Sequence, residues 1–474
     1  MLFNSISFFI FLAGVFGFYV SAPQKLRPAV LLLASYIFYA VLSLPYAGLL
    51  LCSTLSGYGA ALLLAAAKSP SRKKFIVVLC LCFNIALLFA FKYSFFFYEI
   101  IKSLVGFAGI AYEFPAVHIL LPVGISFYTF KTISYIIDVY RKSVNPEKDF
   151  IVFALYVSFF PSLLAGPIDR ASRLLPQLRE NRRLSIHSMA MGAQLIFWGL
   201  FKKVVIADRL AIYADSVFNN VAHHTGPSFL VAAYFYTIQI YCDFSGYTDM
   251  ARGVAALFGF NLMQNFNLPY FATTITDFWR RWHITLSTWF RDYLYIPLGG
   301  NRKGTLRTYC NLLLTMAVCG LWHGASWTFI LWGVLHGLML CASRATLSLR
   351  DKTYAFLRMP NRAVIVLRTA ITFNIVCFLW IFFRANTISD ALTIISRMGT
   401  GWPVLFVDAM TMLHGILGIV VLCIVECIQR VGGSIRESVC RSPLPVRWAI
   451  YLAAFFSIVL FGVDGGSQFI YFQF

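Results

Sequence analysis

The sequence predicts an all-α protein that crosses a membrane many times, and three observations lead to this prediction. Hydrophobic residues make up 59% of the 474 positions, whereas Asp, Glu, Lys and Arg together make up only 12%. A soluble domain carries about twice that charged fraction. Long stretches without formal charge recur along the chain, and about 20 apolar residues suffice for a helix to span a bilayer. Lipid must therefore be part of the solvent around this fold.

The uncharged stretches can be read in order as membrane spans. The chain begins with 24 uncharged residues and no basic segment, which favours a retained first span over a cleaved signal peptide. The short segment 150–165 is interrupted by Pro and Gly and is interpreted as re-entrant. We expect roughly ten to twelve spans in one membrane domain, residues 1–474. The other candidate spans are 28–67 (two spans, broken near 43–45), 75–91, 119–141, 184–201, 228–242, 308–343 (two helices around Gly324), 366–383, 409–425 and 447–463.

The net charge of +20 comes from basic residues that lie in short segments between the apolar stretches. In a soluble protein this excess would indicate nucleic-acid binding. Here a positive-inside bias against an anionic membrane surface explains it better, so membrane lipid is an expected partner and nucleic acid is not. The eleven Cys show no metal-type spacing and no disulfide framework, and no metal site is predicted.

His323 is the strongest candidate for a reaction centre. It lies in the charge-free segment 308–343, between bulky Trp322 and the small residues Gly324 and Ala325. Ionisable side chains within membrane segments are costly and usually functional. A buried neutral imidazole can act as a general base, and small neighbours leave room for a substrate or for a close helix crossing. The alternative is an imidazole that only packs between helices.

A second candidate site surrounds His283 in the least membrane-like part of the chain, residues 261–307. One interpretation is an interfacial helix with its Trp residues at the headgroup level. The other is a mouth that holds an anionic cofactor, because Arg suits phosphate groups. The residues that would bind this cofactor are Arg280, Arg281 and Trp282.

Three further polar residues lie in apolar segments. His336 follows His323 by 13 residues, so on a continuous helix it would face about 220° away, and we expect a packing or supporting role. Asp243 and Asp249 are expected to form structural ion pairs with Arg252 or with an Arg from elsewhere, rather than to act as catalytic acids. The sequence contains no P-loop, no dinucleotide-binding Gly motif and no GxSxG.

Two central motifs carry a family resemblance. DFWRRWHITLSTWFRDYLYIPLGG, followed by GLWHGASWTFILWGVLHG, resembles the membrane-bound O-acyltransferases, and in particular the bacterial alginate O-acetylases and peptidoglycan O-acetyltransferases. Supporting segments run through nearly the whole chain: GISFYTFKTISYIIDVYR, FFPSLLAGPIDR, GLFKKVVIADRLA, QIYCDFSGYTDMARG, FFRA (382–385) and the C-terminal FIYFQF.

The resemblance implies a fold, a reaction and a location. It implies about eleven helices, several of them short or tilted, around a central funnel, with the catalytic motifs in 261–345. His323 matches the catalytic histidine of the family, and His283 matches a second polar position. Acetyl-CoA would serve as the acyl donor from the cytoplasm, with no permanently bound cofactor. The acetyl group would reach a cell-surface polysaccharide outside a bacterial inner membrane, through a periplasmic partner protein.

Other functions remain open at the level of sequence. A polysaccharide or lipid transporter would share the spans and the basic loops. However, it would leave both central motifs unexplained, and no internal repeat is visible. A non-enzymatic scaffold for an export complex would need no base in the membrane. Within the family, D-alanyl transfer ranks below acetylation, and the motifs do not separate alginate from peptidoglycan as the acceptor.

Overall fold

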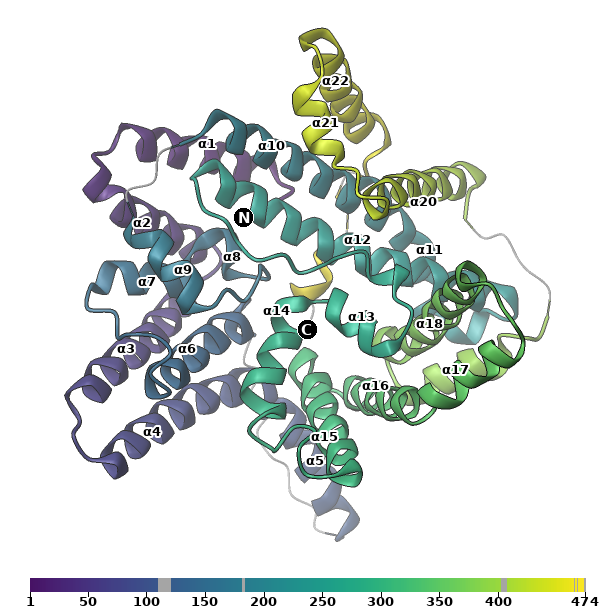
Figure 1. The fold of residues 1–474 in the computed structure, drawn as a ribbon, viewed down its shortest axis with the longest axis horizontal. Helices are drawn as coiled ribbons and strands as arrows, with labels where there is room; N and C mark the ends of the chain where they lie inside the picture. The colour runs from purple at the N-terminus through teal and green to yellow at the C-terminus, as the bar shows by residue number, and fades with distance from the viewer. Residues whose placement is uncertain (110–120, 181–183, 402–406, 464, 467, 473–474) are drawn as a thin grey trace. The chain divides into compact units, whose positions relative to one another are not determined.

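A computed structural model describes the chain except residues 110–120, 181–183, 402–406, 464, 467 and 473–474. The described residues form helices joined by short loops and contain no strand, which confirms the predicted all-α class (Figure 1). They divide into two compact units, 1–192 with 251–263 and 193–250 with 264–474. Helices α10 (Ile186–Leu200) and α12 (Pro227–Leu257) contribute residues to both units.

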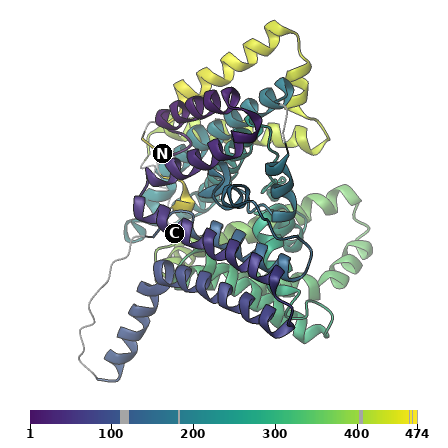
Figure 2. The ribbon, with the colours of Figure 1, turned by 90° about the vertical axis from the view of Figure 1, so that its left-hand side faces the viewer.

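The first unit contains α3, α4 and α6, which lie side by side (Figures 1 and 2). A buried polar contact helps to join α3 to α4, since Ser53 donates to the Asn84 side-chain oxygen at 2.7 Å. Hydrogen bonds between polar side chains are a common link between membrane helices. The helices wholly within this unit are α1 (Ile6–Ser21), α2 (Arg27–Ala40), α3 (Leu44–Ala66), α4 (Pro70–Leu88), α5 (Ser94–Phe107), α6 (Ile125–Tyr140), α7 (Phe150–Ser158), α8 (Phe160–Leu163) and α9 (Ala171–Arg179).

The segment interpreted as re-entrant is broken where its sequence indicates. Helix α7 ends at Ser158, and α8 begins two residues later with Pro161 in its first turn. All side chains from residue 152 to residue 169 are buried, and the Lys131 ammonium donates to the Ser162 hydroxyl at 2.9 Å. Protein therefore surrounds the irregular backbone, which is the condition for such backbone at membrane depth.

The second unit holds both central motifs. The stretch 308–343 forms two helices that break at Gly324, as predicted. The helices wholly within this unit are α11 (Asp208–Phe218), α13 (Ile275–Arg281), α14 (Ile284–Phe290), α15 (Thr305–His323), α16 (Trp327–Ala345), α17 (Leu347–Phe356), α18 (Asn361–Arg384), α19 (Ile388–Arg397), α20 (Ala409–Arg430), α21 (Ile435–Arg441) and α22 (Leu444–Phe461).

The described helices include six that are long and apolar enough to cross a membrane, and the shorter apolar α1 adds a seventh candidate. The chain is therefore a multi-pass membrane protein, while the expected total of ten to twelve spans stays a prediction. The six are Leu44–Ala66, Pro70–Phe107, Trp327–Ala345, Asn361–Arg384, Ala409–Arg430 and Leu444–Phe461.

Candidate active site

Close packing of α15 against α16 positions His323 at the end of α15. A Cβ atom on Gly320 would lie 2.2 Å from the Phe329 carbonyl oxygen, and one on Gly324 would lie 2.3 Å from the Phe329 ring. Only glycine permits these approaches. The small residues beside the imidazole therefore serve a close helix crossing, one of the two roles that the sequence suggested for them.

The imidazole of His323 lies in an aromatic enclosure. Its side chain is 3% exposed. The rings of Trp322, Trp332 and Phe383 meet it edge-on, with centroids 5.0, 5.2 and 5.3 Å away. Such surroundings exclude water, which strengthens electrostatic interactions around the imidazole.

His283 lies at the break between α13 and α14 and has a φ of 40°, in the left-handed region. This backbone conformation costs a residue with a Cβ of order 1–3 kcal/mol and tends to occur at functional sites. Asn265 holds the turn, since its carbonyl oxygen accepts from the Ile284 N–H at 2.9 Å and its side-chain oxygen accepts from the Thr285 hydroxyl at 2.6 Å. His283 is fully buried, so its side chain does not lie on the exposed face of these short helices.

The structure brings His283 and His323 to the same indole. The Trp322 ring lies 6.0 Å from the His283 ring and 5.0 Å from the His323 ring, between centroids. Phe244 contacts His283 from another side, at 4.7 Å. Two histidines 40 positions apart in the sequence thus belong to one buried aromatic cluster.

Burial lowers the pKa of His283 from 6.5 to about 3, so the imidazole is neutral at physiological pH. Above pH 6.5 the folded and unfolded chains both hold it neutral. As the pH falls below 6.5, the unfolded chain gains a proton that the folded chain excludes, and stability is lost. We expect wild type to lose stability relative to His283→Asn by up to about 1.4 kcal/mol per pH unit between pH 6.5 and 4.5. Thermal unfolding of both proteins across this range measures the difference, and parallel pH profiles would contradict it.

His336 does not face away from the cluster. The offset of about 220° assumed one continuous helix, whereas the chain breaks at Gly324 and α16 folds back along α15. The Trp279 indole N–H donates to His336 Nδ1 at 3.3 Å, and the Trp332 ring lies between His336 and His323, at 4.8 and 5.2 Å. His336 therefore supports the ring that encloses His323, in line with the expected supporting role.

The three residues predicted to hold an anionic cofactor lie in different surroundings. Arg280 is exposed, and Arg281 pairs with Asp277 at 2.8 Å on α13. Trp282 is 1% exposed and packs against Phe278 and Trp380. An exposed guanidinium can meet a phosphate directly, whereas Trp282 can act only through its neighbours. The assignment of these residues to a cofactor stays a prediction.

The carboxylates of α12 form ion pairs with two lysines. Lys203 bonds both Asp243 at 2.6 Å and Asp208 at 2.8 Å, and Lys202 bonds Asp249 at 2.7 Å. Both lysines lie on the π-helical turn Phe201–Ala207, where the extra residue per turn alters which side chains face α12. The structural role expected for these carboxylates fits the ion pairs, while the identity of their partner required the tertiary structure.

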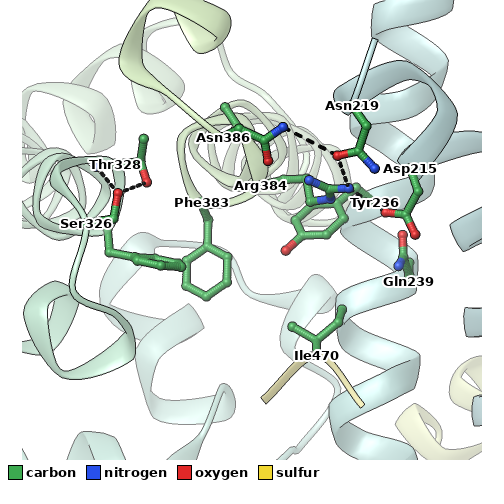
Figure 3. A pocket seen from close by; sticks show the side chains of 12 residues that line it. Asp215, Asn219, Tyr236, Gln239, Ser326, Thr328, Phe383, Arg384, Asn386 and Ile470 are labelled. Atoms are coloured by element: carbon green, nitrogen blue, oxygen red, sulfur yellow. Dashed lines mark hydrogen bonds and ion pairs between the residues drawn. The ribbon is translucent and has the colours of Figure 1, made fainter. Parts of the chain in front are cut away.

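A polar chamber of about 410 Å³ lies beyond the aromatic enclosure (Figure 3). Phe383 and Phe329 form part of its wall, and their rings lie 4.8 Å apart. Because Phe383 also contacts His323, a single aromatic ring separates the imidazole from the chamber. The remaining lining residues are Asp215, Asn219, Tyr236, Gln239, Ser326, Thr328, Arg384, Ala385, Asn386 and Ile470.

The chamber presents paired charges and uncharged polar groups. Arg384 donates to Asp215 at 2.6 Å and to Asn219 at 3.1 Å, as Figure 3 shows. The Tyr236 hydroxyl and the Gln239 amide oxygen have no hydrogen-bond partner among the described residues, so a ligand could satisfy them. No pattern in the sequence predicted this chamber. Its one signal was Arg384, which ends an apolar span within the FFRA motif.

The sequence of this chain matches one protein family and several known proteins. The model of the MBOAT, membrane-bound O-acyltransferase family, matches residues 146–386. The probable alginate O-acetylase of Azotobacter vinelandii is 42% identical over 404 residues, covering 84% of this chain and 78% of the relative. The peptidoglycan O-acetyltransferase of Helicobacter pylori is 40% identical over 437 residues, covering 84% and 80%. The teichoic acid D-alanyltransferase of Bacillus subtilis is 29% identical over 274 residues, covering 56% and 69%.

The matched region includes His283, His323 and most of the residues that line the chamber. Family membership decides against the transporter and the non-enzymatic scaffold. The chain belongs to the membrane-bound O-acyltransferase family, and it is a multi-pass membrane enzyme that transfers acyl groups to oxygen atoms of an acceptor.

Proposed function

We propose that this enzyme transfers acetyl groups from acetyl-CoA to a hydroxyl acceptor, for O-acetylation of a cell-surface polysaccharide such as alginate or peptidoglycan. The observation that carries the proposal is the position of His323, buried in an aromatic enclosure one ring away from a polar chamber. Acetylation is preferred over D-alanylation because the acetylating relatives match 84% of the chain, against 56% for the D-alanyltransferase.

The reaction needs one base. The acceptor oxygen attacks the thioester carbonyl carbon while the His323 imidazole takes the hydroxyl proton. The carbon–sulfur bond then breaks, and the imidazolium returns the proton to the departing thiolate. Acetyl-CoA and a hydroxyl thus give an acetyl ester and free CoA, and the enzyme is left unchanged. A neutral histidine can begin this cycle, and the closed aromatic wall excludes water as a competing acceptor.

His283 acts near the same reaction centre in this proposal. Its low pKa keeps it neutral, so it can donate one N–H to the developing oxyanion without adding a charge to the apolar cluster. The left-handed backbone at His283 fixes the direction of its side chain. Its contact with Trp322 couples its position to that of His323.

The charges at the ends of the spans indicate how the site is oriented. Arg302, Lys303 and Arg307 precede or begin α15, at the opposite end from His323. The C-terminal end of α16 carries Arg344, and the N-terminal end of α18 carries Arg362. By the positive-inside rule these ends face the cytoplasm of a bacterial inner membrane. The chamber at the C-terminal end of α18 then opens toward the outside, where the acceptor is found.

The two substrates therefore approach from opposite faces. Acetyl-CoA comes from the cytoplasm, where exposed arginines such as Arg280 can meet its phosphates. The acceptor hydroxyl enters the chamber, whose volume lies in the usual range of roughly 300–1,000 Å³ for small-molecule sites. The hydroxyl belongs to the polysaccharide itself or to a periplasmic partner protein that passes the acetyl group on.

Purified enzyme in proteoliposomes tests the proposal. Labelled acetyl-CoA is added on one side, and alginate or peptidoglycan fragments are added on the other, with or without an extract of periplasmic proteins. We expect CoA release that depends on an acceptor, together with labelled ester on that acceptor. Absence of CoA release and of ester under every acceptor condition would contradict acetyl transfer.

Matched variants show whether the chamber receives the acceptor. Asn386→Trp places a large ring in the chamber, whereas Ser389→Trp places the same ring on an exposed position of α19 that does not line it. Only the first should reduce ester formation, by about tenfold or more if the ring blocks one substrate contact worth 1.4 kcal/mol. Equal transfer by the two variants would show that the acceptor does not bind in this chamber.

A further inference from the structure

A second hollow lies between α10, α20, α21 and α22, away from the chamber residues. Its volume is about 420 Å³, and its walls are almost entirely apolar. Three helices contribute stripes of side chains: Gln194, Phe197 and Trp198 from α10, followed by Phe201 of the π-helical turn after it, Val421, Val425 and Gln429 from α20, and Ile450, Tyr451, Ala453, Ala454 and Ser457 from α22. Arg436 and two apolar residues of α21 close one end.

Most polar residues of this groove gather at its α21 end, whereas Ser457 lies farther along α22 and donates to the Ala454 carbonyl oxygen at 2.7 Å. Gln194 donates to the Tyr451 hydroxyl at 3.0 Å and to the Cys440 sulfur at 3.1 Å, which joins α10 to α22 and α21. Gln429 ends the α20 stripe on the same side, one residue before Arg430 ends the helix. Phe201 and Val421 lie at the other ends of their stripes. The groove therefore has a polar end at α21 and a largely apolar end opposite it.

The length of the groove matches one leaflet of a bilayer. From Gln429 to Val421 the α20 stripe rises through eight residue steps, or about 12 Å at the helical rise of 1.5 Å per residue. Half of the hydrocarbon core is about 15 Å thick. Because α20 and α22 are both candidate spans, the apolar part of the groove runs into the membrane from the α21 surface.

The charge around α21 indicates what kind of headgroup would lie there. Arg430, Arg436, Arg441 and Arg447 all lie within 18 residues, against a single acid, Glu437. The opposite end of α20 carries Asp408. This asymmetry places α21 at the anionic cytoplasmic surface. Arg436 is the arginine that lines the groove, and a guanidinium suits a phosphate geometrically.

We propose that this groove binds one anionic phospholipid of the cytoplasmic leaflet. An acyl chain lies along the stripes of α10, α20 and α22, and the phosphate contacts Arg436. The bound lipid fills the space between α22 and α10 and so ties the C-terminal span to the rest of its unit. This site is independent of the acyl-transfer chemistry, because none of its residues lines the chamber or contacts His323.

Native mass spectrometry of the delipidated full-length protein tests the site. The probes are phosphatidylglycerol and phosphatidylcholine with identical acyl chains. We expect one phosphatidylglycerol to bind more tightly than phosphatidylcholine, and Arg436→Gln to weaken it about fivefold, as expected for one basic residue at an anionic surface. Arg441→Gln is the control, since Arg441 lies on the same helix, is exposed and pairs with Glu437 instead of lining the groove.

A second pair of variants tests the apolar part. Ala454→Trp fills the groove and should weaken both lipids, whereas Leu452→Trp, on an exposed position outside the lining, should not. Equal affinity for the two lipids, or no effect of Arg436→Gln, would overturn the proposal. A dimer mass in place of bound lipid would assign the groove to a second copy of the chain. The circular dichroism spectrum of each variant should match that of wild type. A loss of lipid binding then results from the change in the groove and not from unfolding.

Discussion

Replacing His323 with alanine is expected to lower acetyl transfer by about a hundred- to ten-thousandfold, the range that general base catalysis contributes. The fold should survive, because the position of His323 depends on the packing of Gly320 and Gly324 against Phe329 and not on the imidazole. The measurement is acetyl ester formation from labelled acetyl-CoA in proteoliposomes, normalised to folded protein.

His223→Ala serves as the control for this prediction, since His223 is exposed on the short turn Val221–His223. That variant should retain normal transfer. His323→Asn preserves some of the side-chain volume and should be as inactive as the alanine variant, because an amide cannot accept the hydroxyl proton. Full activity in either His323 variant would show that His323 is not the general base. Another residue of the cluster would then have to take the proton.

Replacing Lys203 with methionine should destabilise the protein by about 3–5 kcal/mol, the cost of leaving buried charges without their partner. Lys203 is buried, and its ammonium lies 2.6 Å from Asp243 and 2.8 Å from Asp208. Asp243 also accepts the Ile470 N–H at 2.9 Å, so the lost ion pair also weakens the attachment of the C-terminal segment. Thermal or denaturant unfolding in detergent measures the loss.

The matched control is Lys352→Met, an exposed lysine on α17, which should change stability by less than about 0.5 kcal/mol. Adding Asp243→Asn to Lys203→Met should recover part of the loss, because one of the two buried carboxylates is then neutral. A Lys203→Met protein as stable as wild type would mean that these carboxylates are stabilised by other contacts. The ion pair would then have no structural role.

His283 and His323 illustrate how much of the candidate site could be predicted from the sequence. His323 stands out because an ionisable residue in 36 uncharged positions is costly and therefore noticeable. His283 has no such contrast, since Arg280, Arg281 and Asp277 surround it in the sequence, and the family resemblance was needed to select it. Its full burial and its left-handed backbone arise from the turn that Asn265 holds. The contact between Asn265 and Thr285 cannot be predicted from a local sequence pattern.

The sequence by itself determined the all-α membrane class, the positions of the six described helices that are long and apolar enough to cross a membrane, the break at Gly324 and the family, because apolar length, charge-free runs and motifs are local properties of the chain. The tertiary structure decided that lysines pair with Asp243 and Asp249, that His336 supports the enclosure of His323, and that a polar chamber lies behind Phe383. Those features join segments that are far apart in the chain. Only the packing of helices fixes which of their faces meet, and a periodic apolar pattern says which residues are buried without saying against what.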